Sequence, residues 1–164
     1  KNYTLLIDGI NRYYDEKLPL LLWIFEAKSH NSNTQEQANL IYTELLKNIW
    51  QSIYDPQLET VKTVEQFFHP DYEQCINGVK MNLNEYIPHV LEQKKNMNID
   101  TIDYKHIIEQ GNELFAIYYP KGKNINNLPI EAEVIAYFYF EDKQILKIHG
   151  LVRIINGELA DVDM

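Results

Sequence analysis

Histidine and tyrosine are the residue types with which this sequence could do chemistry. General acid–base catalysis needs a side chain whose pKa lies near neutral pH and which reaches the substrate. The candidates are His106 and His149, which lie in segments whose polar and apolar residues alternate as in strands. Alternation places His106 on the same strand face as Tyr104 and Ile108, from which it could project into a pocket beside a phenol. A satisfied or exposed strand histidine is the alternative, because a lone histidine is weak evidence of a site.

His149 alternates along its segment with Lys147 and Arg153, which favours the solvent face of a sheet. A β-bulge inserts one extra residue and would reverse that assignment. We therefore keep both His106 and His149 as candidate catalytic residues.

No other catalytic or metal-binding pattern is present in the sequence. The five histidines are far apart and show no paired zinc-ligand spacing; they are His30, His69, His89, His106 and His149. There is no glycine-rich phosphate loop and no GxSxG nucleophile elbow. The single cysteine, Cys75, excludes an intrachain disulfide and has no evident neighbouring cation to activate it. We predict no cofactor and no metal site.

The composition is that of one ordinary globular domain, with 45% apolar and 24% charged residues in a chain of 164. Twelve tyrosines suit half-buried sheet faces, pocket walls or association surfaces. The formal net charge of −9 and the scattered basic residues argue against a nucleic-acid partner and against an anionic membrane. The longest apolar run, at 18–25, is shorter than the roughly 20 residues of a membrane span, and the N-terminus does not resemble a secretory signal. The expected location is the cytoplasm.

Two helices are predicted in the first half of the chain. The first covers about 34–54, where Thr34 and Gln37 have the form of a capping box and apolar residues recur at helical spacing. The second would begin at Asp55 and Pro56, because aspartate is a good N-cap and proline suits the first helical position.

A third helix follows a segment at 69–78 that has the composition of a turn-rich connection. It would begin at Asn82 or Asn84 and run to Met97. Pro88 favours the later start, because proline is tolerated only in about the first turn of a helix.

Four strands are predicted in the last third of the chain, where Ile, Val, Tyr and Phe are frequent and alternate with polar residues. They are expected near 101–110, 113–119, 130–140 and 144–155. Gly111 and Asn112 would turn the first strand into the second, and 120–129 would be a polar loop. One face of the last strand would carry Leu146, Ile148, Gly150, Val152 and Ile154. Three helices followed by an antiparallel meander predict an α+β fold with the helices on one face of the sheet.

Several segments resemble the SnoaL-like branch of the nuclear transport factor 2-like superfamily. They are FFHPDYEQCING at 67–78, LNEY at 83–86, YFEDKQI at 139–145, KIHGL at 147–151 and the tail at 156–163. The resemblance covers about 34–164, and 1–33 would be an N-terminal extension that is helical in part. It implies a cone-shaped fold in which a curved, mainly antiparallel sheet of about four strands and three helices enclose a pocket.

What this fold does varies, because related proteins include cyclases, isomerases, dehydratases and members that only bind or associate. The resemblance and the strand pattern together predict the ligand-binding residues, which are Tyr72, Tyr86, Tyr104, Tyr118, Tyr137 and Gly150. Many SnoaL-like sequences have glutamate after the histidine that corresponds to His149. Gly150 would therefore mark a lost carboxylate, which weakens the case for an enzyme.

Three functions follow as hypotheses. The first is the binding of a small, largely apolar molecule in the helix–sheet pocket. The second is a cofactor-independent isomerase, cyclase or dehydratase in which His106 or His149 moves a proton while a tyrosine hydroxyl stabilises an enolate. The third is a non-catalytic module that forms a homodimer through the sheet.

Overall fold

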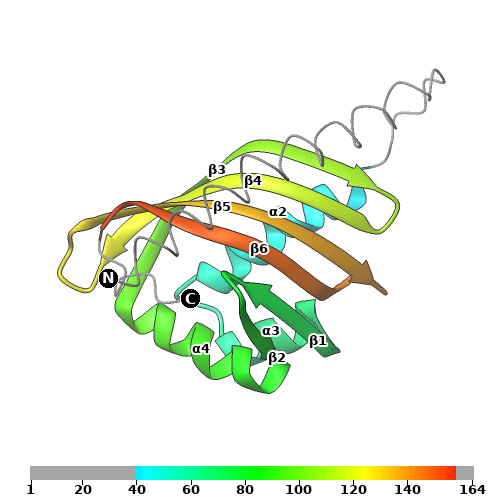
Figure 1. Ribbon diagram of the computed structural model, residues 1–164. Coiled ribbons are helices and arrows are strands. Elements are labelled where there is room, and N and C mark those ends of the chain that lie inside the picture. Colours follow the sequence, from blue (N-terminus) through cyan, green and yellow to red (C-terminus); the bar gives the residue numbers. More distant parts are fainter. Residues whose placement is uncertain (1–39, 158–164) are drawn as a thin grey trace. The chain divides into compact units, whose positions relative to one another are not determined.

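The computed structural model describes residues 40–157, and these form three helices packed on one face of a six-stranded sheet (Figure 1). The helices are α2 (Ile41–Tyr54), α3 (Thr60–Phe67) and α4 (Leu83–Asn96). The strands are β1 (Phe68–Ile76), β2 (Val79–Asn82), β3 (Met97–Gln110), β4 (Glu113–Asn124), β5 (Pro129–Glu141) and β6 (Gln144–Asn156). The α+β class is confirmed, but the predicted number of about four strands is wrong. The predicted extension at 1–33 lies outside the described residues.

Of the two additional strands, β1 occupies most of the segment at 69–78 that was expected to be a turn-rich connection, and β2 lies between that segment and α4. The strand order is β2-β1-β6-β5-β4-β3, and β1 pairs with β6 in parallel while the other neighbours are antiparallel. Asn77 and Gly78 both have positive φ and form the tight turn between β1 and β2. Pro70 lies where the register of β1 against β6 shifts, so the missing proline N–H interrupts the pairing at a bulge.

The helix starts differ from those predicted. The described part of the first helix begins at Ile41, and the expected capping box at Thr34 lies outside the described residues. The first backbone N–H groups of α2 are capped by another element, since the Glu109 carboxylate on β3 accepts hydrogen bonds from Tyr42 N and Thr43 N at 3.0 and 2.8 Å. This carboxylate therefore fixes the beginning of α2 above the sheet.

The starts of α3 and α4 correct two further predictions. Glu59, rather than Asp55, caps α3 by accepting hydrogen bonds from the backbone of Val61 and Lys62. The earlier start of α4 is the right one, because Asn82 and Glu85 form a reciprocal capping box.

Pro88 consequently lies inside α4, beyond the first turn. The cap at the beginning of the helix thus outweighed the unfavourable position of the proline.

The long strands follow the predicted meander with two differences. β4 continues through Asn124, so the expected loop at 120–129 shrinks to a short turn. A register shift in the β5–β6 pairing places Ile145, which is fully buried, on the core face instead of the predicted Leu146. Beyond this bulge the predicted face of β6 is confirmed, with Ile148 and Gly150 buried.

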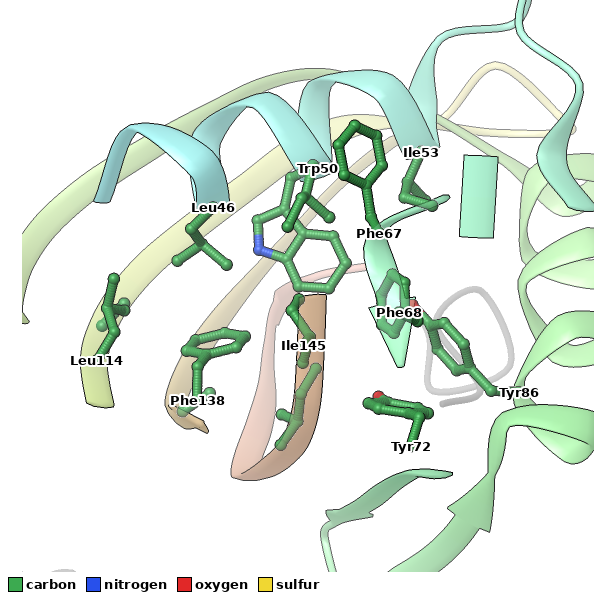
Figure 2. Packing of buried hydrophobic residues seen from close by; sticks show 14 of the residues in the cluster. Leu46, Trp50, Ile53, Phe67, Phe68, Tyr72, Tyr86, Leu114, Phe138 and Ile145 are labelled. Carbon is green, nitrogen blue, oxygen red and sulfur yellow. The ribbon is translucent and has the colours of Figure 1, made fainter. Parts of the chain in front are cut away.

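The core lies between α2 and the face of the sheet that the helices cover, which we call the inner face. Figure 2 shows Leu46, Trp50 and Ile53 projecting from α2 toward Phe138 and other buried strand residues. Register places Tyr104, Tyr118, Val134 and Val152 side by side across the inner face. We call the opposite face the outer face. Within the described residues, no helix has the length and apolar character needed to cross a membrane.

Candidate functional site

The candidate site is a cavity of about 80 Å³ between α2, α4 and the inner face of the sheet. At about 10–15 Å³ for one water molecule, this space holds several. Apolar side chains make up most of its wall: Trp50, Ile76, Met97, Ile99, Ile102, Pro120, Ile130, Ala132, Val134, Ala136, Ile148 and Val152. The remaining lining residues are Tyr54, Tyr86, Tyr118, Gln74, Gln93, His89 and Glu131. A cavity with an apolar wall and a few polar groups is the usual form of a small-molecule site.

Tyrosines from five elements surround this cavity. Tyr54 on α2, Tyr86 on α4 and Tyr118 on β4 line it directly. Tyr104 stacks on Tyr118 with ring centroids 5.5 Å apart, and Tyr72 packs against Tyr86 at 5.2 Å. Figure 2 shows Tyr72 and Tyr86 meeting beside Phe68. The site is therefore built from phenols that are distant in sequence.

Burial determines the ionisation of these phenols. It raises the pKa of Tyr54 to about 12. Burial first, and neighbouring tyrosines second, raise the pKa values of Tyr72, Tyr86 and Tyr118 well above the usual range of a phenol. The same causes raise the pKa of Tyr104. At neutral pH all five are uncharged hydroxyls, which can donate hydrogen bonds but cannot act as bases.

Two buried amides interrupt the apolar wall. Gln74 on β1 is 7% exposed and Gln93 on α4 is 9% exposed, and both line the cavity. The Tyr72 hydroxyl donates a hydrogen bond of 2.8 Å to Oε1 of Gln74, which fixes the orientation of that amide. Trp50, which also lines the cavity and is 7% exposed, adds a third neutral polar group, and its Nε1 atom is buried without a hydrogen-bond partner among the described residues.

His89 and Glu131 are the ionisable residues of the lining besides the tyrosines. His89 is half-buried on α4. The Glu131 carboxylate forms an ion pair with Lys121 at 3.2 Å, so its charge already has a partner. Any acid–base chemistry in this cavity would have to use one of these two side chains.

The structure separates His106 from Tyr104, which the sequence placed on one face. The register between β3 and β4 shifts between these two residues, so Tyr104 is opposite Tyr118 whereas His106 is opposite Ile117. The bulge turns the His106 side chain to the outer face, where it is exposed. The prediction that His106 shares a face with Tyr104 is wrong for this reason, and His106 is not among the residues that line the cavity.

His149 and Tyr137 are neighbours on the outer face, where β5 and β6 pair them. His149 is exposed, so the solvent face suggested by its alternation is the observed one. The Tyr137 hydroxyl donates to the Glu113 carboxylate at 3.2 Å. Neither residue lines the cavity, and a catalytic role of His149 or His106 stays a prediction without support from this geometry.

Gly150 is buried on the inner face, as expected. Close packing of the neighbouring strand explains why this residue is glycine. A Cβ atom there would lie 2.7 Å from the carbonyl oxygen of Ile135 and 2.9 Å from the Cβ of Ala136. The close approach of β5 leaves no space for a side chain, which accounts for the missing carboxylate without reference to a ligand. Gly150 is not among the lining residues.

Of the predicted ligand-binding residues, Tyr86 and Tyr118 line the cavity, while Tyr72 and Tyr104 pack directly behind them. Sequence reasoning missed Tyr54 and the two glutamines. Gln74 could have been found, because it alternates with Tyr72 and Ile76 on the buried side of β1.

The sequence matches no protein-family profile. It is similar to an uncharacterized protein of Schizosaccharomyces pombe, with 25% identity over 104 residues that cover 63% of this chain and 80% of the relative. This similarity carries no functional information, because the relative is itself uncharacterized.

Solved structures with the same fold are more numerous. A protein described as a SnoaL-like polyketide cyclase from Jannaschia sp. CCS1 has a TM-score of 0.58 at 7% identity, covering 74% of this chain and 91% of its own. A hypothetical protein with a ketosteroid isomerase-like fold from Catenulispora acidiphila, in complex with trimethylamine, has a TM-score of 0.56 at 10% identity, covering 74% and 93%. The resemblance to the nuclear transport factor 2-like superfamily is thus confirmed at the level of the fold.

Proposed function

We propose that this domain binds a small, largely apolar molecule in the cavity between α2, α4 and the inner face. The observation that carries the proposal is the wall of the cavity, where apolar side chains and uncharged phenols surround a space large enough for several waters. Burying apolar ligand surface there would provide roughly 25 cal/mol for each Å² removed from water. Empty apolar space costs packing energy, so its retention suggests a use.

Native mass spectrometry of protein purified from its own host tests this proposal. A co-purified small molecule of defined mass is the expected result, and it would identify the ligand. An empty dimer would instead favour the third hypothesis, an association module that pairs through the outer face.

A variant that fills the cavity sharpens the test. Ala132 lines the cavity and is 3% exposed, so Ala132→Phe would place a ring in the ligand's space. We expect ligand occupancy to fall at least tenfold while circular dichroism stays native. The matched control is Leu151→Phe, which adds a ring on the outer face, where Leu151 is opposite Ile135. Equal occupancy in both variants would contradict binding in this cavity.

A second candidate function, a cofactor-independent isomerase, cyclase or dehydratase, has one observation in its favour. His89 and Glu131 line the same cavity as the phenols and could move a proton on a bound molecule. The raised pKa values of Tyr86 and Tyr118 make these hydroxyls weaker acids, which argues against strong stabilisation of an enolate. Loss of turnover in His89→Gln with unchanged ligand occupancy would distinguish catalysis from binding.

A further inference from the structure

Gln74 and Gln93 each replace an apolar residue that the pattern of its element calls for. On β1 the buried inner positions are Tyr72, Gln74 and Ile76. On α4 the buried residues recur at helical spacing, and Gln93 lies one turn after Val90. Burying an amide without a hydrogen-bond partner costs about 1–3 kcal/mol in proteins. Two glutamines at positions where the pattern calls for apolar residues, both in the wall of one cavity, therefore need a reason.

Hydrogen bonds within the protein do not fully explain why these two residues are glutamines. Gln93 is 9% exposed, and its side chain lines the cavity without a hydrogen bond to a described residue. The fully buried side-chain atoms without a partner among the described residues are others, namely Trp50 Nε1 and the Tyr104 hydroxyl. The Gln74 amide has a partner for its oxygen, which accepts from Tyr72, and none among the described residues for its NH₂ group. Each side chain thus brings unused hydrogen-bonding capacity to the cavity.

The hydrogen bond from Tyr72 determines which hydrogen-bonding sites of Gln74 remain available to a ligand. Because one lone pair of the amide oxygen is engaged at 2.8 Å and neither N–H of the amide is, Gln74 offers a bound molecule two donor sites and one acceptor site, which favours a ligand acceptor. Tyr72 is 1% exposed and is packed between Phe68 and Tyr86, so its hydroxyl holds a fixed position. Gln74 is accordingly oriented as a hydrogen-bond donor before any ligand arrives, which lowers the entropy cost of binding.

The charges of the wall restrict the ligand further. No lysine or arginine is among the lining residues, so His89 is the one lining side chain that could carry a positive charge beside an anionic group. The Glu131 carboxylate is already paired with Lys121, so an ammonium group would compete with an existing ion pair. Neutral amides and neutral phenols favour a neutral polar group.

We propose that Gln74 and Gln93 form the polar subsite of this cavity, and that they select ligands with a neutral hydrogen-bond-accepting oxygen, such as a carbonyl, on an otherwise apolar skeleton. This inference rests on the proposed binding function and specifies the class of molecule. Gln74 is the principal specificity-determining residue, Gln93 adds a second polar contact, and Tyr72 acts as a positioning residue through Gln74.

Calorimetric titration of the full chain with three probes of one shape tests the subsite. The probes are 2-acetylnaphthalene, its hydrocarbon counterpart 2-isopropenylnaphthalene, and the anion 2-naphthoate. We expect the ketone to bind about tenfold more tightly than the hydrocarbon, in line with one net hydrogen bond, and the anion to bind most weakly.

Variants test whether the two glutamines cause the preference for the ketone over the hydrocarbon. In Gln74→Leu the tenfold preference for the ketone should disappear while the hydrocarbon binds at least as well as before. Tyr72→Phe keeps the ring but removes the hydroxyl that orients Gln74, and it should reduce the preference to a few-fold. The matched control is Gln66→Leu, the same change at an exposed position of α3, which should leave the preference unchanged. Thermal unfolding confirms that each variant is folded.

The outcomes separate the two proposals. If ketone and hydrocarbon bind the unaltered protein equally, the subsite is overturned while binding in the cavity stands. If the ketone preference survives in both Gln74→Leu and Gln93→Leu, the subsite is likewise overturned. If none of the three probes binds, the proposed binding function fails together with the subsite.

Discussion

The two faces of the sheet use tyrosine in different ways. On the inner side the pKa values of Tyr118 on β4 and of Tyr86, which packs on Tyr72 of β1 from α4, are raised mainly because the hydroxyls are buried. On the outer face the pKa of Tyr119 is raised first by its hydrogen bond to the Glu133 carboxylate, at 2.6 Å. Glu133 in turn accepts a hydrogen bond of 3.0 Å from Arg153. The tyrosines of the inner side are buried among uncharged groups, whereas those of the outer face form hydrogen bonds to carboxylates.

This difference indicates on which face of the sheet a ligand is expected to bind. Charged side chains and the exposed His106 and His149 gather on the outer face, where solvent screens them. Around the cavity the polar groups are mostly neutral phenols and amides, and low polarity strengthens each hydrogen bond made there. A small ligand gains more from the inner face, whereas a protein partner would contact the outer face.

Raising the pH should have the largest effect on the free energy of unfolding, because it ionises the buried phenols around the cavity. Tyr54 has a folded-state pKa of about 12 against an ordinary value of 10. Its stabilising contribution is therefore fully present below about pH 10 and is lost as the pH rises toward 12. Each phenol with a raised pKa lowers the free energy of unfolding by about 1.4 kcal/mol per pH unit in its own window, so several together should unfold the domain.

Phenolate absorbance and circular dichroism, followed together as the pH is raised, measure this effect. We expect both signals to change in one cooperative step. Tyr54→Phe should make the free energy of unfolding depend less steeply on pH. Tyr119→Phe on the outer face should have a smaller effect, because solvent screens the interaction with Glu133 that raises the pKa of Tyr119. Gradual ionisation of every tyrosine with a native spectrum would show that the inner phenols are accessible to water.

A methyl group at Gly150 should have the next largest effect on the free energy of unfolding. Gly150→Ala places a Cβ within 3 Å of both the Ile135 carbonyl oxygen and Ala136, so β5 and β6 must move apart. Overpacking of this kind costs about 1–3 kcal/mol. Denaturation by urea measures the loss, and His149→Ala is the control, since it changes the adjacent residue on the outer face. Unchanged stability in Gly150→Ala would mean that the strands are less closely packed than described.

The sequence predicted most of the long strands and helices but not the cavity lining. Alternation gave the buried face of β5 correctly, because Ala132 to Phe140 continue without a bulge. It failed at His106, because one inserted residue in β3 leaves no distinct trace in a single sequence. It also failed at β1, where Pro70 and His69 conceal a strand whose pairing partner lies more than seventy residues away in β6.

The cavity lining is harder to predict for a related reason. Gln74, Gln93 and Tyr54 come from three elements, and only their packing brings them together. A pattern within one element shows that Gln74 is on the buried side of β1, but it does not show that the space in front of it is empty. Whether a buried polar residue is satisfied or available depends on contacts across the fold, which local alternation does not encode.

Removal of the His106 side chain should have the smallest effect on the free energy of unfolding. It tests the bulge in β3 that places Tyr104 and His106 on opposite faces of the sheet. Because His106 is exposed on the outer face, His106→Ala should change the free energy of unfolding by no more than about 0.5 kcal/mol. Tyr104→Ala, two residues earlier on the inner face, should cost several times more because it removes the ring stacked on Tyr118. Urea denaturation compares the variants, and native mass spectrometry compares their ligand occupancy. A fall in ligand occupancy in His106→Ala, with stability unchanged, would place the histidine in the cavity and show that β3 lacks this bulge in solution.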